Sequence, residues 1–368
     1  MTTAVSEHAP EAPTPEAHIN PRWRRWLRAG IVALVGLYTV VMLAGGAFVL
    51  LARVNVGWVE FGKSGYLLGL WSVIPALMVA LLLRNRWLIG GMLPLIALIT
   101  VYYAPYLLPK AAATVPPDTP TITVMTFNLF SPRDGADGFA RIMRESGADV
   151  VAVQELSDFI AESLAESLAD AYPHQALHPQ DGHGNYFRGQ GIFSRFPIIE
   201  DDYWQFDEIP IDMTHGHQRV VVDVDGREVV VYNTHAWPPL DWKGGLAFTR
   251  TTWEDDAHQL SISLLLERVQ PDIDAQRPVI VVGDFNFSDQ FIEYAQMTAI
   301  FTDAFRAAGQ GMGFTYPSRG FGPIPPLIRL DYVFHNAVLE TLAAQIWSES
   351  GASDHLPVLA TLTLNQPD

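Results

Sequence analysis

Three long apolar runs within the first 110 residues constrain this 368-residue chain more than any other feature. They cover about residues 27–52, 66–83 and 87–108, and Arg28, near the start of the first run, is the only charged residue in them. Each run approaches the ~20 residues that a helix needs to cross ~30 Å of hydrocarbon. A cleaved signal peptide would explain only the first run, and buried core helices would rarely supply three. We therefore predict three transmembrane helices.

Basic residues beside the runs predict which way the helices cross. Most lie in the N-terminal flank and in the short second loop, namely Arg22, Arg24, Arg25, Arg28, Arg84 and Arg86. The positive-inside rule then places the N-terminus inside and the residues after 110 outside. No acidic residue or histidine lies inside a run, so we interpret the helices as an anchor rather than as an ion pathway.

The charge divides the chain into two parts. Residues 1–110 hold nine Lys/Arg and four Asp/Glu, a net of +5, whereas residues 111–368 hold 14 and 36, a net of −22. We expect a disordered, basic-ended cytoplasmic tail at 1–26, the three helices within 27–109, a Pro-containing linker at 110–121 and a soluble domain at 122–368. The chain has no cysteine, which excludes disulfides, thiolate metal sites and cysteine nucleophiles.

Strand and helix patterns alternate after residue 121, which predicts one α/β domain. Apolar strands are expected at 122–127, 150–154, 279–283, 330–335 and 356–364, and helices at 139–145, 159–171 and 258–268. Two β-rich runs flank Asp225-Gly226, a strong hairpin signal.

Polar residues collect where the predicted strands end, which is where α/β proteins place their sites. The set consists of Asn128, Glu155, His235, Asp284, Asn286, Asp331, Asp354 and His355. Each residue alone has a structural explanation, since Asn and Asp favour turns and Glu155 could cap a helix. The repetition at so many strand ends favours a functional site.

Carboxylate and amide oxygens are the ligands that a hard cation such as Mg²⁺ prefers. A metal and protonated histidines can neutralise the charge that develops on phosphoryl oxygens. A histidine beside a carboxylate, as in Asp354-His355, can also exchange protons near neutral pH. The residue types therefore predict metal-assisted hydrolysis of a phosphoester.

Seven ordered stretches resemble the endonuclease/exonuclease/phosphatase superfamily, which includes DNase I-like nucleases, sphingomyelinases and inositol phosphatases. They are TFNLF, VVAVQEL, GQGIFSRFPI, VYNTHAW, VVGDFNFSD, RLDYVF and SDHLPV, and the resemblance covers about residues 120–366. It implies a DNase I-like two-sheet α/β sandwich after the transmembrane segment. It also implies an enzyme, a metal-dependent phosphoric ester hydrolase.

The resemblance further implies a metal site. Glu155 would be the principal Mg²⁺ ligand with Asn128 beside it, and Mn²⁺ or Ca²⁺ would be possible substitutes. Asp331 or Asp354 would complete the metal shell or orient an imidazole. Apurinic endonucleases of the superfamily carry an acid two residues after the first Asn, where this chain has Phe130. That departure argues against a second metal and a base-excision role.

The remaining roles are implied in the same way. Asp284 would orient or deprotonate the attacking water, and Asn286 would hold the phosphate or that water. His355 would contact the scissile phosphate and transfer a proton. His235 would stabilise the phosphate or the leaving group, so the acid and base roles stay open between the two histidines. Asn128 would also lie against the substrate.

The charge bears on the substrate. Nucleases contact many phosphates through Lys and Arg, whereas residues 111–368 hold one lysine, Lys243. Arginines near the motifs leave a local basic patch open, namely Arg188, Arg195, Arg219 and Arg329. The apolar stretch 321–328, and Trp237 and Trp242, are either packed surface residues or the wall of a lipid pocket. We interpret His215 and His217 as lying outside the metal site.

The chain also resembles bacterial, membrane-anchored members of the superfamily, some of them described as vancomycin- or teicoplanin-resistance proteins. We therefore expect a multi-pass protein of the bacterial cell membrane with an extracytoplasmic catalytic domain, whose partners are the lipid bilayer and a lipid-linked or envelope phosphate. An extracytoplasmic nuclease is the alternative. A non-catalytic binding module is a third, which the intact motif series disfavours.

Overall fold

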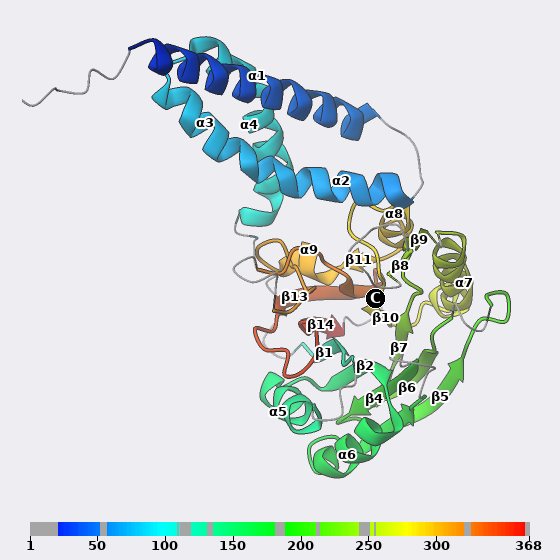
Figure 1. Cartoon of the computed structure of the whole chain (residues 1–368). Coiled ribbons are helices and arrows are strands. Elements are labelled where there is room, and N and C mark those ends of the chain that lie inside the picture. Colours follow the sequence, from blue (N-terminus) through cyan, green and yellow to red (C-terminus); the bar gives the residue numbers. More distant parts are fainter. Residues whose placement is uncertain are drawn as a thin grey trace, which may run out of the picture. The chain divides into compact units, whose positions relative to one another are not determined.

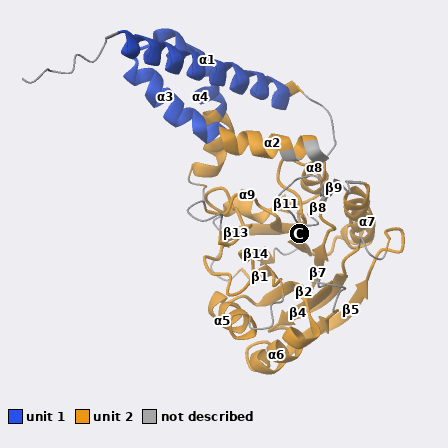
Figure 2. Ribbon diagram, in the orientation of Figure 1, with its two compact units in different colours: residues 1–50, 70–98 blue, residues 51–69, 99–368 orange. Residues whose placement is uncertain are grey.

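The structure is a computed structural model and describes residues 21–51, 57–108, 110, 119–130, 135–180, 188–210, 214–242, 251–253, 255–319 and 325–364. The predicted tail up to residue 20, most of the linker, Lys243 and residues 321–324 of the apolar stretch lie outside this part, as does the side chain of Trp242. Two compact units are present, residues 1–50 with 70–98 and residues 51–69 with 99–368 (Figure 2).

Apolar helices form the N-terminal part of the chain. They are α1 (Pro21–Leu51), α2 (Gly57–Gly69), the 3₁₀ turn η1 (Leu70–Ser72), α3 (Val73–Leu82) and α4 (Arg86–Leu107). Three stretches, 22–51, 62–82 and 86–107, are long and apolar enough to cross a membrane. Only 17–22% of the apolar windows is buried, as expected of helices that face lipid, and these helices indicate that the protein associates with a membrane.

Small residues bring helices of the first unit together. A Cβ on Gly36 of α1 would lie 3.7 Å from Leu88 of α4, and one on Gly91 of α4 would lie 3.4 Å from Thr39 of α1. Membrane helices have no water between them to drive association, so close packing at glycine is a common substitute. Val35, Leu88 and Met92 are buried in the same contact.

The second unit contains two six-stranded mixed sheets (Figure 1). The first sheet has the order β13 (Leu339–Ile346), β14 (Val358–Leu364), β1 (Thr121–Asn128), β2 (Val150–Leu156), β4 (Gly189–Ser194) and β3 (His174–His178). The second has the order β11 (Thr302–Asp303), β12 (Asp331–His335), β10 (Val279–Asp284), β7 (Arg227–His235), β6 (His217–Val224) and β5 (Ile198–Trp204). A separate pair consists of β8 (Leu240–Trp242) and β9 (Thr251–Trp253).

Alternation along the strands explains why the sheets stack. Ile122 and Val124 of β1 lie in the apolar core between the two sheets, whereas Met125 and Phe127 face the opposite side. Successive side chains of a strand point to opposite faces, so a strand that is apolar throughout is buried on both. The predicted two-sheet α/β sandwich is confirmed.

Helices cover the outer faces. α5 (Ala136–Ser146) and α6 (Asp158–Leu168) cover the first sheet, and α7 (Asp255–Asp274) and α8 (Ile292–Thr298) cover the second (Figure 1). α9 (Ala304–Ala308) packs beside β12 and β13, with Ala304 in the core between the sheets. Ser157 caps α6 by accepting a hydrogen bond from the Ile160 amide at 3.4 Å. The predicted hairpin joins β6 to β7, with positive φ at Asp225 and Gly226.

The strand directions distinguish one end of the sandwich, where the parallel strands have their carboxyl ends. β1 pairs parallel to β2 in the first sheet, and β7 pairs parallel to β10 in the second. The carboxyl ends of parallel neighbours lie at the same edge of a sheet, and polar groups gather there in α/β proteins. The predicted site residues follow these strand ends.

Candidate active site

Strand register brings three side chains of the second sheet together. Asp284, the last residue of β10, lies opposite Asp331 on β12 and opposite His235 on β7. All three side chains are buried. Because the pairing fixes their backbones side by side, this half of the site is a direct consequence of sheet topology.

A bulge in β2 aims Glu155 at the same place. The register with β4 shifts between Gln154 and Leu156, and Glu155 has a left-handed φ of 55°. A bulge residue is left out of the regular strand pairing, so its side chain can point in a direction that the pleat would not allow. The Asn128 amide nitrogen then joins both sheets, donating to Glu155 Oε1 at 3.1 Å and to Asp284 Oδ2 at 2.9 Å.

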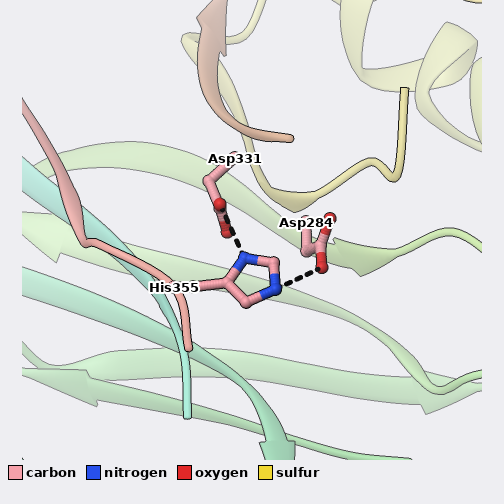
Figure 3. Close-up of side chains that lie close together, drawn as sticks. All are labelled: Asp284, Asp331 and His355. Carbon is pink, nitrogen blue, oxygen red and sulfur yellow. Dashed lines mark hydrogen bonds and ion pairs between the residues drawn. The ribbon is translucent and has the colours of Figure 1, made fainter. Parts of the chain in front are cut away.

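His355 is oriented by a buried aspartate (Figure 3). Its Nδ1 lies 2.8 Å from Asp331 Oδ2, and its Nε2 points to Asp284 Oδ2 at 3.7 Å. The backbone amide of His355 donates to Ser353 Oγ, whose hydroxyl donates to the Asn128 carbonyl at 2.6 Å. An aspartate on Nδ1 fixes the ring and leaves Nε2 to face the site.

His235 approaches the same carboxylate from the other side. Its Nε2 lies 3.5 Å from Asp284 Oδ2 and 3.2 Å from Asn286 Nδ2. Asn286, with a φ of 52°, also donates to the Ala236 carbonyl at 3.0 Å. The ring of His215 stacks on His235 with centroids 3.8 Å apart.

Burial shifts the pKa values of the acids upward. Burial raises the pKa of Glu155 to about 8 and that of Asp284 to about 7, and in both cases nearby carboxylates add to the rise. Acids held together in a low-dielectric site resist full ionisation. A bound cation would remove that cost, so the cluster has the electrostatics of a metal site.

The two histidines are shifted in opposite directions. Burial alone would lower the pKa of His355, but Asp331 and Asp284 outweigh it and raise the pKa to about 10. Burial, together with His215 and His355, lowers the pKa of His235 well below its ordinary value. Neighbouring groups whose pKa values are shifted in opposite directions are a recurrent feature of acid–base sites.

The donor set fits a divalent cation. Asp284, Asp331 and His355 each offer one ligand atom within 4.8 Å of the others, and Asp331 Oδ1 is buried without a hydrogen-bond partner. Asp354, less buried than these groups, also has a buried Oδ1 without one. The Asn128 oxygen accepts from the Phe130 amide, which leaves a lone pair for a metal. The carboxylate and amide oxygens here suit a hard cation, whereas the His355 ring, kept protonated by Asp331, would not bind one.

All eight predicted residues gather at this end of the sandwich, and the structure adds groups that the sequence does not reveal. Gln154 donates to the side chain of Asn233 at 2.7 Å, which cross-links the sheets beneath the site. The ring of His215 also stacks on that of His235, a contact between distant residues that no local pattern in the sequence predicts. Gln154 is the last residue of a predicted strand, but nothing in the sequence near Asn233 indicates that the two side chains meet.

Three of the four arginines near the motifs, Arg195, Arg219 and Arg329, are paired with carboxylates. Arg219 pairs with Asp272 at 2.8 Å, and Arg195 pairs with Asp149 at 3.3 Å. Arg329 is buried and pairs with an aspartate of β11 at 2.5 Å. An arginine already bound to a carboxylate has little to offer a phosphate backbone.

Comparison with known proteins identifies the class. The family model described as "Endonuclease/Exonuclease/phosphatase family" matches residues 125–355, more than half of the chain. The protein therefore belongs to the endonuclease/exonuclease/phosphatase family, whose members are metal-dependent phosphoric ester hydrolases, and the resemblance seen in the sequence is confirmed. No match was found among curated protein sequences.

Solved structures are similar in fold. An endonuclease/exonuclease/phosphatase from Bacteroides vulgatus has a TM-score of 0.52 at 19% identity and covers 67% of this chain and 100% of its own. A functionally unknown conserved protein from Enterococcus faecalis gives 0.53 at 16%, covering 66% and 100%. A family protein from Bacteroides thetaiotaomicron gives 0.51 at 18%, covering 68% and 100%.

Proposed function

We propose that this protein uses Mg²⁺ to hydrolyse a lipid-linked phosphate of the bacterial cell envelope, with its catalytic domain outside the cytoplasm. The observation that carries the proposal is the strand-end cluster, in which Glu155, Asp284 and His355 converge. The same compact unit includes residues 51–69 and 99–107 of the apolar helices, so the site belongs to a body that would lie at the membrane.

Each residue has a chemical role in this proposal. A metal held by Glu155, with Asn128 or Asp354, supplies positive charge against the phosphoryl oxygens. Asp284 accepts the proton of the attacking water, for which a pKa raised to about 7 is suitable near neutral pH. His355, protonated and fixed by Asp331, donates to the phosphate or to the leaving oxygen.

His235 and Asn286 complete the substrate side of the site. His235 is neutral at physiological pH because burial lowers its pKa, so its ring can accept a hydrogen bond without taking up a proton. Asn286 donates to the Ala236 carbonyl, and this bond holds its amide beside the His235 ring. Both side chains therefore present polar atoms where a phosphate would lie next to Asp284.

Charge favours a lipid phosphate over nucleic acid. Residues 111–368 carry a net charge of −22, and the paired arginines described above offer no continuous track for a phosphate backbone. A single lipid phosphate needs only the metal and the local donors. The residue set that catalysis would need is present, which disfavours a non-catalytic module.

The test compares substrates with the full-length protein in lipid nanodiscs with Mg²⁺. We expect release of phosphate from nanodiscs doped with phosphatidic acid or a polyprenyl monophosphate, and no nicking of supercoiled plasmid. Glu155→Ala should abolish turnover, whereas Glu166→Ala, on the exposed face of α6, should not. Plasmid cleavage without lipid turnover would overturn the substrate proposal in favour of a nuclease.

A reporter fused after Asp368 tests the orientation. Alkaline phosphatase, which is active only outside the cytoplasm, should be active when fused there. Green fluorescent protein fused at the same position should not fluoresce. The reverse pattern would contradict the extracytoplasmic placement.

A further inference from the structure

The loop that follows β10 carries Asn286 and contacts the molecule on three sides. We call residues 285–291 the β10 loop. Its three phenylalanines are buried in the aromatic core on the outer face of the second sheet. Asn286 turns toward His235, and the hydroxyl of Tyr332 donates to the Phe287 carbonyl at 3.0 Å. The remaining residues, Ser288 to Gln290, point to neither the core nor the site.

These remaining residues contact α2 and α4. The hydroxyl oxygens of Ser288 and Ser64 of α2 lie 2.7 Å apart. Gln290 Nε2 donates to the Tyr102 hydroxyl of α4 at 2.6 Å. Both helix residues belong to the same compact unit as the β10 loop, so these contacts lie within one body.

An ionic contact reinforces the β10 loop at its centre. Asp289 Oδ2 accepts from Arg306 at 2.7 Å and from the Tyr106 hydroxyl at 3.3 Å. The Arg306 guanidinium also lies 3.8 Å from the centroid of the Tyr106 ring. A cation over an aromatic face is an attractive contact, so Arg306 holds the end of α4 and the β10 loop together.

Glu60 of α2 completes the attachment. Its Oε1 accepts a hydrogen bond from the backbone amide of Ile292, the first residue of α8, at 3.0 Å, and the residue is 2% exposed. The N-cap position of α8 is Phe291, which provides no side-chain cap. The first amides of a helix lack internal partners, and here a residue 232 positions earlier supplies one.

We propose that Glu60 is a positioning residue for the hydrolytic reaction: by fixing the end of the β10 loop, it holds Asn286 beside His235. In this proposal α2 and the end of α4 form part of the scaffold of the site. The proposal rests on the hydrolytic function proposed above but on no particular substrate. The competing explanation is that the buried phenylalanines alone hold the β10 loop.

The experiment uses the full-length protein in nanodiscs and the soluble diester bis(p-nitrophenyl) phosphate. Glu60→Ala removes the acceptor, Glu60→Gln keeps an oxygen at that position, and Glu166→Ala is the matched surface control. Tyr102→Phe, which removes the hydroxyl that accepts from Gln290 and that also bonds to Tyr106, covers the case in which Glu60→Ala fails to fold. Hydrogen exchange of the peptide 284–292 is measured on every variant.

We expect Glu60→Ala to lower kcat about tenfold or more with KM changed less than about twofold, because small displacements of a site residue are costly. Exchange in 284–292 should quicken about fivefold. Glu60→Gln should restore both values, and Tyr102→Phe should shift them in the same direction as Glu60→Ala. Unchanged kcat in Glu60→Ala, or equal loss in Glu60→Gln, would overturn the proposal.

The exchange measurement separates this proposal from the proposed function. If the wild-type protein hydrolyses no phosphoester, the function fails, but exchange of the peptide still reports whether Glu60 holds it. Wild-type exchange in both Glu60→Ala and Tyr102→Phe would show that the aromatic core suffices and would refute a positioning role.

Discussion

His355 and His235 face one carboxylate, Asp284, yet their pKa values are displaced in opposite directions. The difference lies in their neighbours, since Asp331 contacts His355 at 2.8 Å whereas His215 stacks on His235. A negative partner stabilises the protonated ring and a buried aromatic stack does not. The sequence left the acid and base roles open between these histidines, and the geometry favours His355 as the proton donor.

Removing the charge of Asp331 should therefore impair catalysis. Asp331→Asn preserves the size of the side chain but weakens the hold on the protonated His355 ring. We expect kcat to fall about 100-fold or more, with the thermal unfolding midpoint close to that of the wild type. Hydrolysis of bis(p-nitrophenyl) phosphate measures the change, and kcat within threefold of wild type would show that the pair has no catalytic role.

Gly283 leaves no room for a side chain. It has a φ of 149°, and a Cβ there would lie 1.8 Å from the Thr234 carbonyl oxygen of the neighbouring strand. Gly283→Ala should cost about 3 kcal/mol or more of unfolding free energy. Gly226→Ala, which has a positive φ but no clash, is the control and should cost about 1 kcal/mol. Urea unfolding in detergent compares them, and equal costs would contradict the steric account.

At the scale of elements, alternation and strand-end chemistry predict most of the fold and the site. Strands that are apolar on both faces predict buried sheets, and Asp225-Gly226 predicts the hairpin. The bulge at Glu155 is not predictable, since the run Val150–Leu156 reads as one regular strand. Neither is the contact of Glu60 with Ile292, which arises only when the second unit folds. Local patterns carry no signal for such distant pairs.

Buried neutral histidines predict how stability depends on pH. Burial lowers the pKa of His258 on α7 to about 4, although a hydrogen bond to the Trp237 carbonyl opposes the shift. The unfolded chain binds a proton near pH 6.5 and the folded one does not, so stability is lost as the pH falls from about 6.5 toward 4.

Replacing this histidine should reduce that pH dependence. His258→Gln should reduce the slope of unfolding free energy by up to about 1.4 kcal/mol per pH unit between pH 6 and 5. Urea unfolding at pH 7, 6 and 5 measures it, with His174→Gln, a partly exposed residue, as control. An unchanged slope in His258→Gln would mean that the ring is protonated in the folded state.

At the scale of the whole molecule, the uneven charge and the apolar helices both divide the sequence near residue 110. Residues 1–110 carry +5 and residues 111–368 carry −22, and the acids of the site contribute to that excess. The sequence predicts a membrane anchor and a separate domain. In the structure, residues 51–69 and 99–107 belong to the same compact unit as the candidate site residues. That division depends on contacts between distant segments, which hydropathy alone cannot reveal.

The central claim is that the strand-end cluster is the active site of a metal-dependent phosphoester hydrolase. The most direct measurement is hydrolysis of bis(p-nitrophenyl) phosphate by the full-length protein after EDTA treatment and again after Mg²⁺ is restored. Wild type and Glu166→Ala should lose activity with EDTA and regain it with Mg²⁺, and Glu155→Ala should remain inactive. Activity that persists in EDTA, or full activity in Glu155→Ala, would contradict the account.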